Sequence, residues 1–384
     1  MRIVKLIFAL IMIFSLASCD NKNDICKIEG NSLIINEGVT ELKRNSFGVS
    51  ISDVENVYLP KSLKKLANGA FFELGMEFKN VYYASDLASW CDIEFGREYS
   101  NPMEHGWLMP KSFYYMDGDN YVKAEDLIIP DGVKVIPDHA FAGFSVKNVV
   151  IPKSVESIGE RSFYGCFIYE GLQFEDESNI KELKRSAFDY VSYFGGELII
   201  PNTISYIGKN ALAFKKFNGR LSLPYLGNLS IDIPFVDFIG AYNASTIRIT
   251  KGEEIGLFCG SSFSGNIEFC DEVVRIKANA FRETFANSIY FSPASKLKII
   301  DDEAFAMVNS RYLFVPEGLD TIAKNSFKGA QMLLILSHAK KKEDIKIANV
   351  DSGLGYMKSV THNDKKTGWV IEDNKIFILG SAQN

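Results

Sequence analysis

A motif of about 23 residues recurs along most of this 384-residue chain, and it constrains the fold more than any other feature. Residues 127–141 and 149–163 show it most clearly, since each has an apolar triplet, a proline, a turn, an apolar pair and a phenylalanine. The copies end at Phe47, Phe71, Phe141, Phe163, Phe188, Leu212, Phe281, Phe305 and Phe327. Successive ends lie 22 to 25 residues apart, except for two gaps of 70 and 69 residues, each close to three periods.

Each part of one copy has a physical role. A triplet such as Leu198–Ile200 suits a short strand, and Pro201 ends it because proline cannot donate a ladder hydrogen bond. The pair Val133 and Ile136 points back into the core, and the phenylalanine fills the space between neighbouring turns. A single copy cannot cover its own apolar side, so copies must stack. We therefore predict a repeat solenoid of the α/β type, right-handed, with one short strand per turn of about 23 residues, a parallel sheet, and otherwise mostly β and irregular coil.

The repeat also sets the domain organisation. The solenoid is predicted over 32–336, with an insert near 84–124 in the first gap and degenerate turns, including Leu221–Pro224, in the second. Residues 337–384 do not fit the repeat, and Trp369–Leu379 is typical of a β-hairpin around Asp373 and Asn374. We interpret 337–384 as a C-terminal cap, with a small separate binding module as the alternative.

The N-terminus predicts export and lipid anchoring. Residues 1–18 combine a short basic region, an apolar stretch and small residues, which is the pattern of a signal peptide. Leu16-Ala-Ser-Cys19 resembles the lipobox of bacterial lipoproteins, in which the cysteine is acylated. We therefore predict lipidation at Cys19, a polar tether over 19–31, and contact with the membrane through this anchor only; an ordinary cleaved signal is the alternative.

Composition and motifs argue against several other functions. A net charge of −6 disfavours nucleic acid, and four histidines give little material for metal or histidine chemistry. No phosphate loop, zinc motif or dinucleotide fingerprint occurs, so no cofactor, small-molecule substrate or metal site is predicted. Asp117–Asn120 resembles part of a calcium loop, but it lacks the remaining ligand positions and is more typical of a surface turn. The carboxylates at 301–303 occupy a repeat position at which other copies have polar, solvent-facing residues. A hydrolase would need carboxylates converging around Asp92 to Glu98, and we predict no enzyme.

The cysteines after Cys19 suggest no chemistry. They are Cys26, Cys91, Cys166, Cys259 and Cys270, an odd number that cannot pair completely. We expect Cys91 to be a small buried apolar residue, and Cys259 with Cys270 is the one pair worth testing for a disulfide.

The strand triplets contain a candidate contact surface. The first and third side chains of each triplet should face the core, so the middle one should face outward. These outward positions hold Ile34, Tyr58, Ile128, Val150, Ile199, Tyr290 and Phe314, with polar Gln173, Ser222 and Glu268 among them. An apolar outer row is a hypothetical protein-binding site at Tyr58, Ile128, Val150, Ile199, Tyr290 and Phe314; alternatively, another layer of the chain covers it or the register differs by one.

The repeat strings resemble a known family. Residues 127–133, Ser-Ile-Gly-Glu-Arg-Ser-Phe-Tyr-Gly-Cys at 157–166 and Asp-Glu-Ala-Phe at 302–305 are similar to BspA-like leucine-rich repeats, and the insert segments 87–96 and 99–102 resemble a segment recurring between repeats of that family. The resemblance covers roughly 32–336 and implies a surface lipoprotein of the type common in Bacteroidetes. It implies a protein-binding module of the cell envelope, at the outer membrane or cell surface, some members being adhesins for host or bacterial proteins. A structural envelope or assembly scaffold is the alternative.

Overall fold

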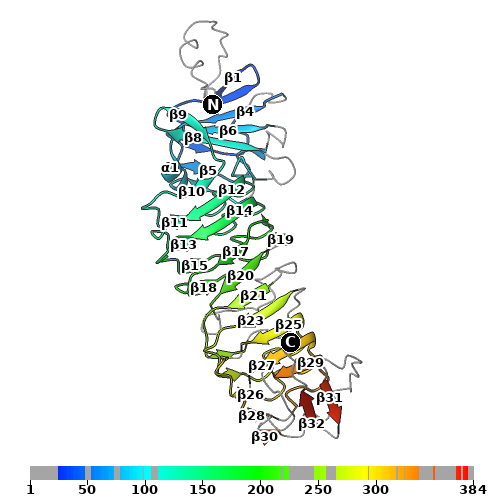
Figure 1. The fold of residues 1–384 in the computed structure, drawn as a ribbon. Coiled ribbons are helices and arrows are strands. Elements are labelled where there is room, and N and C mark those ends of the chain that lie inside the picture. The colour runs from blue at the N-terminus through cyan, green and yellow to red at the C-terminus, as the bar shows by residue number, and fades with distance from the viewer. Residues whose placement is uncertain are drawn as a thin grey trace, which may run out of the picture.

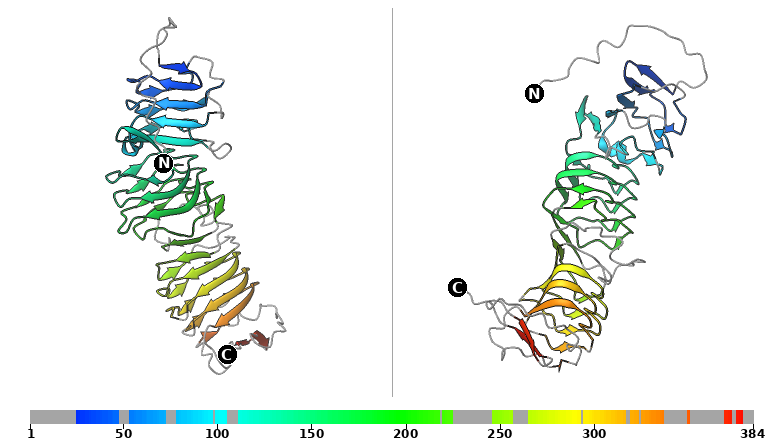
Figure 2. Two further views of the ribbon diagram at one scale, coloured as in Figure 1. Left: turned by 45° about the horizontal axis from the view of Figure 1, so that its top comes forward. Right: turned by 90° about the vertical axis from the view of Figure 1, so that its right-hand side faces the viewer.

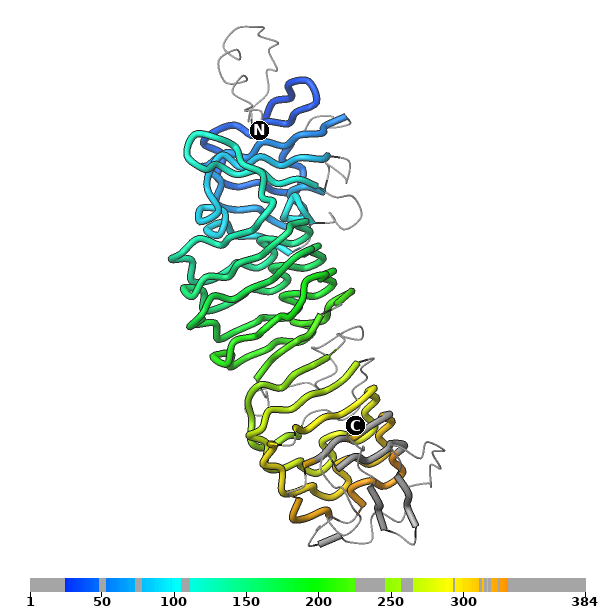
Figure 3. The backbone as a smooth tube through the Cα atoms, viewed as in Figure 1, coloured from blue at the N-terminus to red at the C-terminus, as the bar shows by residue number. Residues whose placement is uncertain are grey.

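A computed structural model places most of the chain in a long array of stacked coils (Figure 1). It describes residues 25–47, 53–72, 78–97, 99–104, 111–217, 219–224, 246–256, 265–292, 294–316, 319–323, 325–336, 349–350, 369–372 and 375–378. The coils follow one another from the N-terminal to the C-terminal end in each view (Figures 2 and 3). The predicted parallel solenoid is therefore confirmed.

The apolar triplets form the main strands, which fall into three consecutive sheets. The first sheet contains β1 (Cys26–Glu29), β2 (Ser32–Ile35), β4 (Asn56–Leu59), β6 (Asn80–Tyr83), β8 (Ser112–Asp117) and β9 (Asn120–Lys123). The second contains β10 (Leu127–Ile128), β12 (Ser145–Ile151), β14 (Phe167–Phe174), β16 (Ser192–Tyr193) and β19 (Lys216–Phe217). The third contains β17 (Glu197–Ile199), β20 (Arg220–Leu223), β21 (Thr246–Ile249), β23 (Asn266–Phe269), β25 (Phe285–Phe291), β27 (Asn309–Val315) and β29 (Gln331–Leu336). Within each sheet, strands of consecutive coils pair in parallel. At the two edges of the first sheet, β1 pairs antiparallel with β2, and β9 pairs antiparallel with β8.

Most coils of the described chain have a second, two-residue strand that was not predicted. These strands are β3 (Glu41–Leu42), β5 (Lys65–Leu66), β7 (Glu94–Phe95), β11 (Val135–Ile136), β13 (Ser157–Ile158), β15 (Glu182–Leu183), β18 (Tyr206–Ile207), β22 (Glu254–Ile255), β24 (Arg275–Ile276), β26 (Ile299–Ile300), β28 (Thr321–Ile322) and β30 (Asn349–Val350). They coincide with the second member of the apolar pair, and Ile136 and Ile158 are fully buried. Backbone bonds such as Gly159 N–H to Ile136 O, at 2.8 Å, join each one to the next coil. Two extended residues are too few to show a period of their own in the sequence.

A column of stacked phenylalanine rings runs through the core. Phe163 lies between Phe141 and Phe188, with ring centroids 5.5 and 5.0 Å apart. Phe305 lies in the same way between Phe281 and Phe327, at 4.9 and 5.4 Å. These rings are fully buried, so each coil supplies the surface that its neighbour's ring needs.

The turn before each phenylalanine has a left-handed residue at a fixed place. The residues are Asn45, His139, Arg161, Ser186, Asn210, Asn279, Glu303 and Asn325, with φ between 50° and 63°. Asparagine tolerates this conformation better than most side chains, which explains its frequency here. The backbone bends so that the phenylalanine N–H can donate to the next coil, as Phe141 N–H does to Ser162 O at 2.8 Å.

The insert is folded into the array. It contains α1 (Leu87–Cys91), which Asp86 caps by accepting a hydrogen bond from Ser89 N–H at 2.7 Å, then β7 and the β8–β9 hairpin. In the second gap, β20 pairs with β21 and β21 with β23, so the third sheet continues through it.

The ends of the chain are described in part. Strand β1 lies within the expected tether 19–31, so the folded array begins earlier than we expected. Strands β31 (Trp369–Glu372) and β32 (Lys375–Ile378) pair antiparallel, while Asp373 and Asn374 lie outside the described residues. The predicted signal peptide and Cys19 also lie outside them. No helix of the described part is long and apolar enough to cross a membrane.

Candidate functional site

The predicted outward residues form one row on each main sheet. In the first sheet, Ile34, Tyr58, Tyr82 and Tyr114 lie directly opposite one another on neighbouring strands. In the second, the row is Ile128, Val150 and Gln173. In the third, it is Ile199, Ser222, Arg248, Glu268, Tyr290 and Phe314. The strand register therefore brings the predicted site residues into line within each sheet.

Two apolar residues of these rows are strongly exposed. Ile128 is 59% exposed and Ile199 is 57% exposed, while both chain neighbours of each are buried. Val150, Tyr58 and Tyr290 are half-buried, and the side chain of Phe314 lies outside the part of the chain that is described. The second and third sheets thus present branched aliphatic side chains to solvent at the ends of β10 and β17.

The first sheet differs, because part of the insert covers its outer face. Tyr58, Tyr82 and Tyr114 stack with centroids 4.5 and 4.6 Å apart. Tyr121 of β9 meets this stack edge-on, 5.4 Å from Tyr82 and 6.3 Å from Tyr58. Burial raises the pKa of Tyr82 to about 12. Tyr58 therefore belongs to a small covered cluster, and it is a weaker candidate for binding than Ile128 or Ile199.

Sequence reasoning missed three members of this tyrosine cluster. Residues Asn80-Val-Tyr82 repeat Asn56-Val-Tyr58 after 24 residues, which was the available signal for Tyr82. Tyr114 and Tyr121 carry no repeat signature, because they belong to the insert hairpin.

A further aromatic patch lies beside the row on the second sheet. Tyr169 of β14 is 49% exposed and stacks on Phe194 with a centroid distance of 5.6 Å. Lys216 places Nζ 4.7 Å from the centre of the Phe194 ring. Polar positions interrupt the row elsewhere: Gln173 and Arg248 are exposed, and Ser222 is buried with its hydroxyl donated to Glu197. The surface is therefore a set of apolar patches and not a continuous stripe.

The insert joins two parts of the solenoid through side-chain hydrogen bonds. The main strands stop at β9 and begin again at β10, and the two-residue strands stop at β7 and begin again at β11. No backbone ladder therefore crosses this point among the described strands. Phe71 N–H donates to Tyr99 O at 3.0 Å, as a repeat phenylalanine normally does to the next coil. On the other side, Ala140 O accepts from Trp90 Nε1 at 2.8 Å and from Asn101 Nδ2 at 2.7 Å. Two side chains thus replace the backbone donor of a preceding coil.

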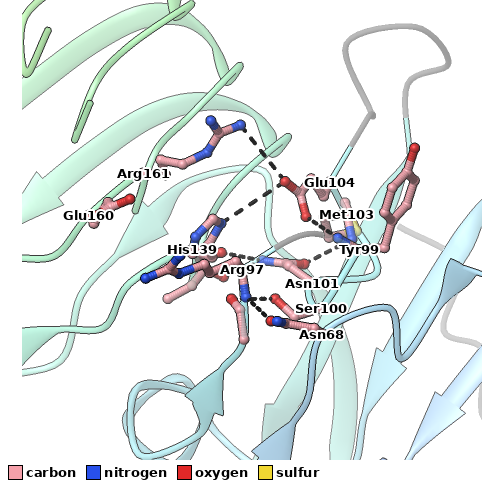
Figure 4. Close-up of polar contacts among 12 residues, drawn as sticks. Asn68, Arg97, Tyr99, Ser100, Asn101, Met103, Glu104, His139, Glu160 and Arg161 are labelled. Carbon is pink, nitrogen blue, oxygen red and sulfur yellow. Dashed lines mark hydrogen bonds and ion pairs between the residues drawn. The ribbon is translucent and has the colours of Figure 1, made fainter. Parts of the chain in front are cut away.

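A buried polar cluster lies at the same junction (Figure 4). Glu104 Oε1 is 4.0 Å from His139 Nδ1 and 3.9 Å from the Arg161 guanidinium, and Glu104 Oε2 accepts from Tyr99 N–H at 2.9 Å. Burial, with the nearby Arg161 charge, lowers the pKa of His139 to about 4. His139 is buried against the insert, and its imidazole is neutral at pH 7.

The remaining chemical candidates are structural in the described residues. Asp117–Asn120 forms the tip of the β8–β9 hairpin, and Asp301 accepts two bonds from Arg275 at 2.8 and 3.0 Å. Among the carboxylates that a hydrolase would need in the insert, Glu94 pairs with Lys65 at 2.7 Å. No group of three or more His, Cys, Asp or Glu side chains in the described ranges could hold a metal ion.

The cysteines that are described also have structural surroundings. Cys91 is buried as expected, and burial raises its pKa to about 12. Cys166 is fully buried, with Sγ 3.0 Å from Phe141 O. Cys270 is half-buried with Sγ 3.7 Å from Gly252 O, and Cys259 lies outside the described residues.

Comparison with protein-family models agrees with this architecture. The family model described as BspA type leucine rich repeat region matches residues 24–97, 119–223 and 239–348, in six copies. The pneumococcal vaccine antigen PcpA is 15% identical, with 87% of this chain and 88% of that chain covered and a TM-score of 0.37. A leucine-rich repeat protein from Bacteroides ovatus is 16% identical, with 80% and 74% covered and a TM-score of 0.37. A leucine-rich cell surface protein from Faecalibacterium prausnitzii is 13% identical, with 86% and 99% covered and a TM-score of 0.29. A search of curated proteins gave no match.

Proposed function

This chain belongs to the family of BspA-type leucine-rich repeat proteins, and from that premise we propose that it is a non-enzymatic cell-envelope protein that binds other proteins. The binding surface is the outer face of the second and third main sheets. Its specific form is an adhesin for host or bacterial proteins.

One observation carries this proposal. Ile128 on the second sheet and Ile199 on the third are more than half exposed, and the opposite face of each sheet is the core. A solvent-facing strand position normally holds a polar residue, and apolar groups that a partner can desolvate provide most of the affinity in protein interfaces. Tyr169 of β14 and Phe194, which follows β16, extend the apolar area at the second sheet. These side chains supply shape and hydrophobic contact, which suits binding and not bond chemistry.

The N-terminal sequence supports the cellular setting. The apolar stretch and Leu16–Cys19 have the pattern of a lipoprotein signal. In this proposal Cys19 is acylated, and the protein is held at the outer membrane or cell surface by its lipid. Intact cells treated with protease should lose the protein if it is surface-exposed. Replacing Cys19 with Ser should shift it from the membrane fraction to the soluble fraction.

The binding proposal is tested with matched surface variants. We expect saturable binding to at least one immobilised host matrix or bacterial envelope protein in a surface plasmon resonance panel. The double variant Ile128→Ser and Ile199→Ser should weaken it at least tenfold. Val135→Ser is the control, because Val135 is 48% exposed in the same coil as Ile128 but lies on the two-residue strand β11 and not on a main sheet.

Two outcomes would count against the proposal. Equal loss of binding in the Val135 control would mean that the outer row is not the site. A well-folded chain that binds none of the panel proteins, yet changes the mechanical or assembly properties of the envelope when deleted, would favour the structural scaffold.

A further inference from the structure

The N-terminal strand β1 has an open edge. It pairs with β2 on one side only, and no described strand lies beyond it (Figure 1). An open strand edge presents backbone N–H and C=O groups that another strand can bind. Which groups these are follows from the register of the β1–β2 pair.

The hydrogen-bond alternation directs Ile28 to the open edge. Asn36 N–H donates to Ile25 O at 2.9 Å, so residue 25 bonds toward β2. Along an antiparallel strand, alternate residues bond to the same neighbour, so Lys27 and Glu29 also bond toward β2. The N–H and C=O of Ile28 therefore point away from β2.

The side chain of Ile28 is also only partly buried. Ile28 lies opposite Leu33, which is fully buried, so its side chain is on the core face of the sheet. Ile28 is nevertheless 41% exposed, because no coil lies above it in the described chain. The end of the hydrophobic core is therefore only partly closed at this residue.

The charges of β1 are self-complementary. Lys27 and Glu29 lie on the outer face and pair with each other at 2.6 Å. If a second copy of β1 lies antiparallel against the first, centred on Ile28, each Lys27 stands opposite the Glu29 of the other copy. The two Ile28 residues then face each other and exchange both backbone hydrogen bonds.

We propose that two copies of this chain pair through β1, antiparallel and centred on Ile28, so that the main sheet continues from one solenoid into the other. This pairing uses the backbone groups of Ile28 that point away from β2, covers its exposed side chain and aligns four alternating charges. It does not depend on the proposed protein-binding row.

Charge reversal tests the pairing. Two full-length copies with different C-terminal tags are co-expressed, and one tag is used to recover the other. The wild-type pair should co-purify. Lys27→Glu paired with itself, and Glu29→Lys paired with itself, should each reduce recovery at least fivefold, because like charges then face each other.

The mixed pair supplies the decisive control. Lys27→Glu co-expressed with Glu29→Lys restores every opposite-charge pair and should recover near wild-type co-purification, which also shows that both variants fold. The double variant Lys27→Glu and Glu29→Lys should pair with itself for the same reason. Equal recovery in all combinations, or no restoration in the mixed pair, would overturn the proposal, and would mean that another segment covers β1 or that the copies do not associate here.

Discussion

At the scale of single residues, the repeat tolerates different side chains at one strained position. His139 occupies the left-handed site that Asn210 and Asn279 fill in other coils, with φ of 60°. It differs because the insert packs on it and removes it from water, with only 5% of its side chain exposed. The charged groups around it are Glu104, Arg161, Asp138, Glu160 and Arg97. Its neutral form is therefore part of the folded structure.

This burial predicts a pH-dependent loss of stability. The pKa of His139 is about 4 in the folded chain, against about 6.5 when unfolded, so between these values the unfolded state binds more protons. Stability should fall as the pH drops from 6.5 to 4, by about 3 kcal/mol from this residue. Denaturant unfolding at pH 7 and pH 4 measures the loss.

The matched variant is His139→Asn, which fits the left-handed turn and cannot take up the proton. It should lose about 3 kcal/mol less than the wild type between the two pH values. If the free energy of unfolding falls by the same amount in both proteins, then His139 takes up a proton in the folded state and is not buried at this junction.

At the scale of elements, the sequence predicts the repeated main strands and core rings but misses the two-residue strands and the contacts that occur once. The triplet strands and the phenylalanine column follow from nine copies of one pattern. The contact between Trp90 and Ala140 joins residues 50 apart and has no counterpart in the other coils as far as they are described. Likewise, the cover that Tyr121 gives to Tyr58 depends on how the β8–β9 hairpin folds back. Neither contact leaves a periodic signal, so the outer row could be located but its exposed members could not be chosen.

The junction made by the insert should depend on Asn101. This residue is buried, donates to His139 O and Ala140 O at 2.7 Å each, and accepts from Met103 N–H at 2.8 Å. Asn101→Leu keeps a similar volume but removes these three buried hydrogen bonds, including the one that Met103 N–H donates, which should cost about 2–4 kcal/mol. Asn148→Leu is the control, because its amide bonds are on the surface, and it should change stability by less than about 0.5 kcal/mol.

Thermal and denaturant unfolding compare the two variants, and limited proteolysis shows where the chain opens. New cleavage in Asn101→Leu should fall in the insert, near 84–124. Equal stability of Asn101→Leu and the wild type would show that the two arrays are held together by other contacts.

At the scale of the whole molecule, stability is a sum of coils and their interfaces. Rings in the phenylalanine column stack on the rings of adjacent coils, and surface ion pairs such as Lys277 with Glu254 also join adjacent coils. Exposed pairs of this kind contribute little, so buried stacking dominates the coupling between coils. The proposed β1 pairing would extend the same arrangement across two copies, with both N-terminal segments at the centre.

Because each coil is coupled mainly to its neighbours, a core substitution should destabilise the adjacent coils most. Phe163→Ala removes a fully buried ring between Phe141 and Phe188 and should cost about 3–5 kcal/mol. Because coils interact with nearest neighbours, amide hydrogen exchange should increase most over 127–217 and little over 265–336. Phe163→Leu is the control, since Leu212 fills the same column position and is fully buried; its effect should be smaller and confined to the adjacent coils. A uniform increase in exchange along both ranges would instead show that the solenoid unfolds as one cooperative unit.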